Sequence, residues 1–140
     1  MPRGIRVKYL LDTNICIYLI RQRPAAVLGR FQQQSPDDFG ISSITLAELR
    51  YGADKSARTS QNHAALDAFV VPLSVIDFDA HAADIYGKVR ADLERRGTPI
   101  GPLDTLIAAH ALRLSTTLVT NNTSEFSRVT GLKIENWTVE

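Results

Sequence analysis

The sequence predicts an α/β fold in which a largely parallel sheet carries helices on both of its faces. Short apolar runs typical of buried strands alternate along the 140 residues with longer segments of helical spacing. Strands that alternate with helices pair in parallel, because each helical crossover returns the chain to the same end of the sheet. The chain contains no internal repeat and no low-complexity tract. We therefore expect one domain spanning residues 1–140.

The first predicted strand, residues 9–11, ends at Asp12. In open α/β sheets, ligands bind just beyond the carboxyl ends of the strands. We therefore expect the Asp12 carboxylate to be solvated and ionised in a crevice at this edge. Aspartate also commonly caps a helix, and a helix is expected from Asn14 onward. This stretch alone leaves both interpretations open.

The next elements repeat the arrangement of a strand followed by an acid. The pattern predicts two helices, a turn and a second strand at residues 14–20, 24–34, 35–38 and 39–44. A helix is expected to follow from Thr45. Thr45 and Glu48 have the spacing of a capping box, in which Glu48 bonds back to the Thr45 backbone. Alternatively, Glu48 faces the crevice beyond the sheet, close to Asp12.

The second half of the chain provides a third acid. The expected elements are helices at 63–70, 79–96 and 103–111 and strands at 72–76, 117–120 and 132–134. Asp104 shares a face of the third of these helices with the apolar residues Ile107, Ala108 and Ala111. An acid on an inward face needs a partner, such as an amide at the helix start, an arginine or a metal ion.

Charge and composition neither require nor exclude nucleic acid. Sixteen Lys and Arg residues against fifteen Asp and Glu residues give a formal net charge of +1. Two groups of arginines could contact phosphates but are expected to be solvated helix faces: Arg21, Arg23 and Arg30, and Arg90, Arg95 and Arg96.

Cysteine content and hydropathy indicate a reducing compartment. The single cysteine, Cys16, excludes an internal disulfide and a cysteine-based zinc site, and we expect it in the core. No apolar segment approaches the roughly 20 residues that a membrane helix needs, and no signal peptide is evident. We therefore expect a cytoplasmic protein without a membrane partner.

Three acids occupy similar positions in the predicted fold, because each follows a strand or lies at the start of a helix: Asp12, Glu48 and Asp104. Three carboxylates at one edge of a parallel sheet repel one another unless a cation lies between them. Their hard oxygen ligands favour Mg²⁺, with Mn²⁺ as a possible substitute, over zinc. Such an ion suits the hydrolysis of a phosphodiester by metal-activated water.

Four segments of the sequence match one known family in its order. They are Leu-Leu-Asp-Thr-Asn at 10–14, Ile-Thr-Leu-Ala-Glu-Leu at 44–49, Pro-Leu-Asp-Thr-Leu-Ile-Ala-Ala-His-Ala at 102–111 and Leu-Val-Thr-Asn-Asn at 118–122. The chain resembles the PIN-domain ribonucleases, specifically the VapC-like toxins of bacterial toxin–antitoxin systems. The segments span nearly the whole chain and are specific together.

The resemblance implies a PIN-like three-layer α/β/α sandwich with a mainly parallel sheet of four to five strands. It implies an Mg²⁺-dependent endoribonuclease that cuts structured RNA, commonly transfer RNA. Asp12, Glu48 and Asp104 would be the catalytic and metal-binding acids, with the hydroxyls of Thr13 and Thr120 in support. Such toxins usually form homodimers, and a cognate VapB-like antitoxin silences them by filling the groove at the acids.

The chain departs from the family pattern after its fourth predicted strand. Many relatives have a fourth acid there, whereas this chain has Asn121 and Asn122, and Asn122 matches the acidic position best. An amide can bind a metal-bound water but neutralises no charge. The departure puts a second metal ion in doubt, and Glu125 is either a compensating acid or a surface residue.

A non-enzymatic interpretation remains beside the nuclease. The same scaffold could be a binding module for RNA or protein whose acids only cap helices. Removal of the acids would then lower stability without any loss of catalysis. The presence of all three main acids favours the nuclease.

Overall fold

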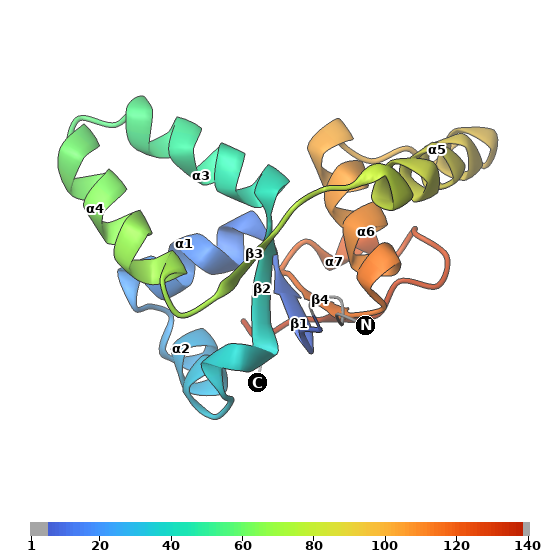
Figure 1. Cartoon of the computed structure of the whole chain (residues 1–140). Helices are drawn as coiled ribbons and strands as arrows, with labels where there is room; N and C mark the ends of the chain where they lie inside the picture. Colours follow the sequence, from blue (N-terminus) through green and yellow to red (C-terminus); the bar gives the residue numbers. More distant parts are fainter. Residues whose placement is uncertain (1–5, 139–140) are drawn as a thin grey trace, which may run out of the picture.

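The structure, a computed structural model, describes residues 6–138 and is built around a parallel sheet (Figure 1). This part of the chain contains five strands in the order β3-β2-β1-β4-β5, and every neighbouring pair is parallel. The strands are β1 Tyr9–Leu11, β2 Phe39–Ser42, β3 Ser74–Ile76, β4 Thr117–Val119 and β5 Ile134–Glu135. The predicted fold class is confirmed.

Seven α-helices and one short 3₁₀ helix, Pro36–Asp38, connect these strands in the described residues. The α-helices are α1 Thr13–Arg21, α2 Ala25–Gln32, α3 Ser43–Asp54, α4 Thr59–Val70, α5 Ala80–Arg95, α6 Pro102–Leu114 and α7 Thr123–Phe126. The helix expected at 79–96 is α5, and Asp79 caps it, because its carboxylate accepts a hydrogen bond from the Ala82 amide.

Helices α3 and α4 begin at least two residues earlier than the sequence predicted. The second strand stops at Ser42 instead of continuing to Ile44, because the Ser42 hydroxyl accepts the Ile44 amide and starts α3 there. Helix α4 begins at Thr59 instead of residue 63. The polar stretch before it forms only a tight turn, in which Thr59 and Asn62 both hydrogen-bond to Ser56.

Alternate residues of the central strand face two separate cores. Tyr9 and Leu11 pack in one core, with residues of α1, α2 and α4, whereas Leu10 packs in the other, with residues of α5, α6 and α7. The period of two in a strand produces this division. The helices therefore form a layer on each side of the sheet (Figure 1).

Close packing inside the sheet requires glycine at position 40. A Cβ atom there would lie 2.9 Å from the Ile76 side chain and 3.2 Å from both the Ser74 carbonyl oxygen and the Val7 side chain. Gly40 lies on β2, next to the central strand. A side chain here would push the neighbouring strands apart, so we attribute this glycine to packing.

The strand order places a topological switch point between β1 and β4. The chain moves from β1 outward through β2 and β3, and then crosses back to β4 on the other side of β1. In open parallel sheets, the crevice at such a point, at the carboxyl ends of the strands, is where ligands bind. Asp12 follows β1 and Thr120 follows β4, so both lie at this point.

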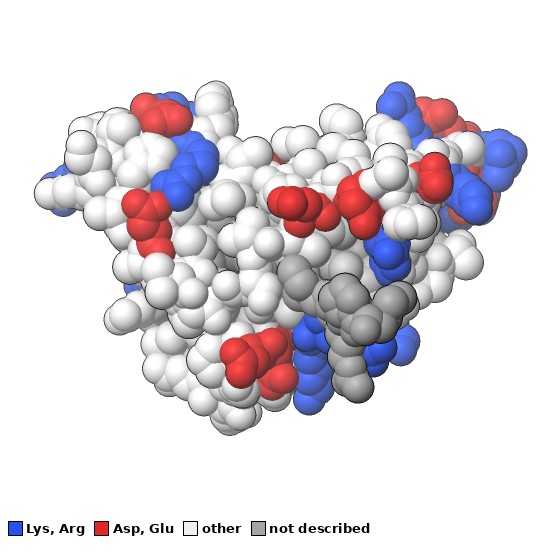
Figure 2. Space-filling view, viewed as in Figure 1, with Lys and Arg blue, Asp and Glu red and all other residues white. Residues whose placement is uncertain are grey.

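The surface dips between the part that α3 and α4 form and the part that α5 and α6 form (Figure 2). Lysine and arginine side chains on this face lie mostly beside acids. Three of the grouped arginines form ion pairs, Arg30 with Glu135, Arg90 with Glu94 and Arg96 with Asp92. Within the described residues, no helix is both long enough and apolar enough to span a bilayer.

Candidate active site

Asp12 is held in place by two hydrogen bonds at the end of β1. Its carboxylate accepts the Thr13 backbone N–H at 2.8 Å and the Thr120 hydroxyl at 2.7 Å. The prediction that Asp12 is solvated is wrong: only 5% of the residue is exposed, because Thr120 and the start of α1 cover it. Burial raises the pKa of Asp12, and the two hydrogen bonds oppose that rise.

Glu48 does not form the capping box that its spacing with Thr45 suggested. Ser42 caps α3 instead, and the buried Thr45 hydroxyl has no hydrogen-bond partner. The Glu48 carboxylate accepts the Thr13 hydroxyl at 2.7 Å. Because Thr13 directly follows Asp12, this bond ties the acid of α3 to the end of the central strand.

Asp104 approaches the same edge from the first turn of α6. It is not the cap of this helix, because Gly101 occupies that position. Burial is the largest cause that raises the pKa of Asp104 to about 7, followed by the charge of Asp12. A hydrogen bond with Glu125 and the charges of Glu125 and Glu48 contribute to the same rise. These acids therefore lie close enough to repel one another.

Asn122 lies between two of the acids. Its side-chain N–H group donates to Asp104 Oδ2 at 3.3 Å and to Glu125 Oε2 at 3.1 Å. The Thr120 hydroxyl accepts the Asn122 backbone N–H at 3.0 Å. Asn122 thus links the two carboxylates through a neutral donor at the position where the resemblance led us to expect an acid, and Glu125 points into the site.

These oxygen donors suit a small, hard cation. Among the described residues, no group of three or more acidic, histidine or cysteine side chains is arranged so that it could hold a metal ion. Mg²⁺ does not need one, because it usually binds one or two carboxylates and keeps several waters. The raised pKa of Asp104 supports this fit, since a cation beside it would offset the repulsion from Asp12 and Glu125.

A groove of about 340 Å³ reaches Glu48, one of the three acids, and runs between α1, α3 and α4. Thr13 and Glu48 line one end of this groove, and its walls are mostly apolar: Ile17, Ile20, Leu49, Ala53, Ala65 and Leu66. Tyr51 lies about one turn beyond Glu48 on α3 and is 65% exposed. The Lys55 ammonium group lies over its ring, with Nζ 5.0 Å from the ring centroid.

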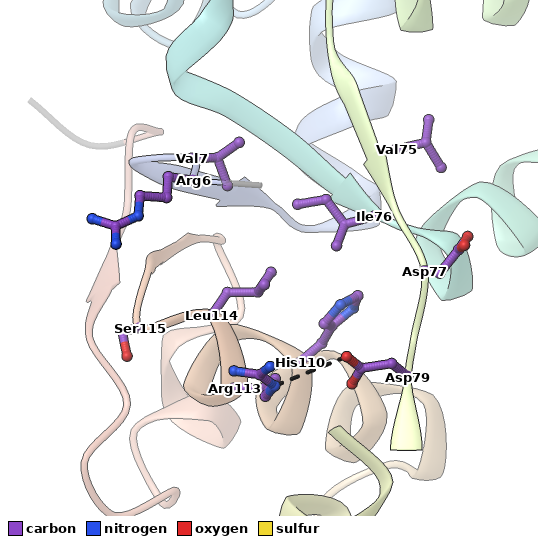
Figure 3. Close-up of a pocket in the computed structure, with 10 residues that line it drawn as sticks. All are labelled: Arg6, Val7, Val75, Ile76, Asp77, Asp79, His110, Arg113, Leu114 and Ser115. Atoms are coloured by element: carbon purple, nitrogen blue, oxygen red, sulfur yellow. Dashed lines mark ion pairs between the residues drawn. The ribbon is translucent and has the colours of Figure 1, made fainter. Parts of the chain in front are cut away.

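A second cavity, of about 730 Å³, lies between β3 and α6 (Figure 3). Figure 3 shows an Arg113–Asp79 ion pair on its rim, with an N–O distance of 3.9 Å. His110 extends from α6 toward β3 in this view. The cavity does not include any of the three acids.

The family follows from a comparison of the sequence with known proteins. Residues 9–132 match the PIN domain family.

The chain belongs to the PIN domain family.

Within this family the chain groups with the VapC ribonucleases. A Shigella flexneri protein named tRNA(fMet)-specific endonuclease VapC is 48% identical over 131 residues, which cover 94% of this chain and 98% of that protein. Ribonuclease VapC2 of Rickettsia felis is 45% identical over 130 residues, covering 92% and 97%. The predicted resemblance to VapC-like ribonucleases is confirmed.

Solved structures show the same PIN fold with a second protein. DNA-bound VapBC from Salmonella typhimurium matches with a TM-score of 0.89 and 45% identity, covering 94% of this chain and 98% of that one. VapBC2 from Rickettsia felis, bound to a promoter DNA fragment, matches with a TM-score of 0.86 and 44% identity. This match covers 92% of this chain and 98% of that one. The three-layer α/β/α prediction is thereby confirmed, whereas the extent of the domain over residues 1–140 stays a prediction.

Sequence reasoning did not select the buried residues that support the site. Ser42 and His110 share a hydrogen bond of 2.8 Å, although they lie 68 residues apart. A histidine on an apolar helix face was the available signal, because such a residue needs a polar partner. The partner could not be identified from sequence, since it depends on how α3 and α6 pack.

Proposed function

We propose that this protein is an Mg²⁺-dependent endoribonuclease that hydrolyses phosphodiester bonds of structured RNA, with transfer RNA as the first candidate substrate. The observation that carries the proposal is the meeting of the acids at the switch point of the sheet, where Asn122 links Asp104 to Glu125 and the Thr13 hydroxyl ties Glu48 to the end of β1. Asp12 also caps α1, but a capping role alone does not explain why Glu48 bonds to Thr13 or why Asp104 lies beside Glu125. Mn²⁺ is a possible substitute for Mg²⁺.

Each polar residue has a distinct role in this proposal. Asp12, Glu48 and Asp104 would hold the metal ion, whose chemistry is to orient the phosphate and to lower the pKa of an attacking water. The Thr120 hydroxyl fixes the Asp12 carboxylate, and the Thr13 hydroxyl fixes that of Glu48. These bonds limit the movement of the acids before RNA binds, which is the preorganisation that phosphoryl transfer needs.

The proposed activity is tested with purified protein, total transfer RNA and Mg²⁺, beside the same reaction with EDTA. Discrete products that vanish with EDTA support the nuclease. If the folded protein cuts neither transfer RNA nor ribosomal RNA, the alternative of a non-catalytic binding module gains support. The two proposals also differ in binding, since a module binds RNA equally well with and without Mg²⁺.

We further propose a cognate VapB-like antitoxin as partner, a homodimer as the assembly and the cytoplasm as location. The solved relatives are VapBC complexes, which supports an antitoxin partner. The groove between α1, α3 and α4 is where its tail would lie, because its lining is mostly apolar, with Arg21 and Lys55 also present, and includes Glu48. An arginine of the tail could then pair with the acids.

Ala65→Arg tests this assignment of the groove. Ala65 is exposed on α4 and lines the groove, so a long cationic side chain there should obstruct an apolar tail without unfolding the helix. We expect affinity for the cognate antitoxin to fall about a hundredfold, as when a central interface contact is blocked. Ala64→Arg, on an exposed neighbouring position outside the groove lining, is the matched control in calorimetric titrations. Equal affinities for the two variants would contradict the groove assignment.

Asn122→Asp tests the departure from the family pattern. The new carboxylate should strengthen Mn²⁺ binding about tenfold, because it adds a charge beside Asp104 and Glu125. Without metal the variant should unfold at a lower temperature, since two hydrogen bonds are replaced by repulsion. Asn121→Asp is the control, as Asn121 donates to the Tyr18 hydroxyl. An unchanged Mn²⁺ affinity in Asn122→Asp would show that position 122 does not face the ion.

A further inference from the structure

Helices α3 and α6 carry two of the three acids and are joined by one buried hydrogen bond. His110 Nδ1 lies 2.8 Å from Ser42 Oγ, and the two residues are 1% and 0% exposed. Ser42 ends β2 and caps α3, whereas His110 lies in the middle of α6. The bond therefore connects the two helices at a point where water does not compete for either partner.

The distances along the two helices place this bond close to the acids. Glu48 follows Ser42 by six residues on α3, and Asp104 precedes His110 by six residues on α6. With a rise of 1.5 Å per residue, each acid is about 9 Å along its helix from the bond. A shift of α6 against α3 at the bond would move the two carboxylates relative to each other by a similar amount.

Several contacts fix the histidine in one orientation. Ser42 Oγ accepts the Ile44 amide and its hydroxyl proton remains available for Nδ1 of a neutral ring. Burial lowers the pKa of His110, which favours that neutral form. The ring also packs edge-on against Phe78 at 5.4 Å, and the Phe78 amide donates to Ser43 Oγ at 3.1 Å.

We propose that His110 is a positioning residue that sets the separation of the Glu48 and Asp104 carboxylates through its hydrogen bond to Ser42. The inference rests on the proposed function, because it concerns the acids that would hold the metal ion. His110 touches neither the acids nor the groove at them. It acts by holding α6 in register with the start of α3.

Substitution of His110 by asparagine or by glutamine distinguishes a role of its hydrogen bond to Ser42 from a role in packing alone. The Asn side chain places an acceptor near the Nδ1 position of histidine, whereas that of Gln extends toward the Nε2 position. We expect His110→Asn to bind Mn²⁺ within about twofold of the wild type. His110→Gln should bind it about tenfold more weakly, which is the low end of the effect of indirect support on metal affinity.

The measurement is a calorimetric titration of the folded full-length protein with Mn²⁺, beside thermal unfolding and the KM and kcat for total transfer RNA. His110→Gln should lower kcat at fixed Mg²⁺ and leave KM for the RNA unchanged. Leu93→Ala is the control for lost stability, because Leu93 is buried in the core beside α6 and lies outside the site. It should lower the unfolding temperature with an unchanged Mn²⁺ affinity.

Ser42→Ala removes the other end of the bond and serves if His110→Gln does not fold. The double variant Ser42→Ala/His110→Gln should bind Mn²⁺ no more weakly than the weaker single variant, since both changes break the same His110–Ser42 bond and only Ser42→Ala also removes the cap of α3. The inference would be overturned if His110→Gln bound Mn²⁺ as tightly as the wild type. It would also be overturned if His110→Asn or Leu93→Ala bound Mn²⁺ as weakly as His110→Gln. A wild type that neither binds Mn²⁺ nor cuts RNA would reject both this inference and the proposed function.

Discussion

Asp104→Asn is expected to lower the rate of RNA cleavage by about a thousandfold, equivalent to about 4 kcal/mol of activation free energy. Asparagine is nearly the same size and can keep the contact with Asn122, but it removes the charge that would hold the metal ion. The metal-free variant should unfold at a temperature equal to or above that of the wild type, because repulsion from Asp12, Glu125 and Glu48 is relieved.

The measurement compares initial rates on total transfer RNA at saturating Mg²⁺, with EDTA as a second control. Asp84→Asn is the matched variant, since Asp84 is an exposed aspartate on α5, away from the sheet edge. It should cut at the wild-type rate. Cutting by Asp104→Asn at the rate of Asp84→Asn would remove Asp104 from the site, and a contaminating nuclease would then be the first alternative.

The second large effect concerns the stability of the metal-free protein as a function of pH. Asp104 has a pKa of about 7 in the folded protein, against 3.8 as its ordinary value. The folded state therefore holds this proton more tightly than the unfolded chain does. The resulting stabilisation is complete below about pH 4 and is lost as the pH rises to about 7. Metal-free protein should accordingly become less stable across this range.

Urea denaturation at pH 5.5 and pH 7.5 measures this change in the free energy of unfolding. Asp104→Asn should show less of the loss, and the difference between the two proteins isolates Asp104 from other groups. His110 contributes in the opposite sense, because its lowered pKa costs stability as the pH falls.

Mg²⁺ should reverse the loss of stability at pH 7.5. A ligand that binds only the folded state adds about 2.7 kcal/mol when it is present at 100 times its dissociation constant. Asp104→Asn should gain much less from the same addition. If the wild type loses no stability between the two pH values, or if both proteins respond equally to Mg²⁺, the acids do not share one site.

Local sequence patterns predicted the elements well where they depended on neighbours in the chain. The strand Tyr9–Leu11 and the start of α5 at Asp79 could be predicted because each depends on residues only a few positions apart in the sequence. The same patterns failed where a distant group decided the outcome. Asp12 was expected in solvent, but Thr120 bonds to it across 108 residues and buries it.

The site itself was predictable in composition but not in contacts. The acids could be selected because each follows a strand or opens a helix. The sequence left open whether Glu48 faces the crevice or forms a capping box with Thr45. Only the packing of α1 against α3 shows that Glu48 bonds to Thr13 instead. The link that Asn122 makes between Asp104 and Glu125 also required the folded chain, since it depends on where α6 meets the end of β4.

The wide separation of the site residues in the chain has a consequence for protein synthesis. Asp12 leaves the ribosome early, but Thr120 and β4, one of the two strands that pair with β1, follow only more than a hundred residues later. A nascent chain that has not yet released β4 lacks both the Thr120 hydrogen bond to Asp12 and the Asn122 link to Asp104. For the proposed nuclease, most of the translation time therefore passes before cleavage of cellular RNA becomes possible, which gives a co-produced inhibitor time to accumulate.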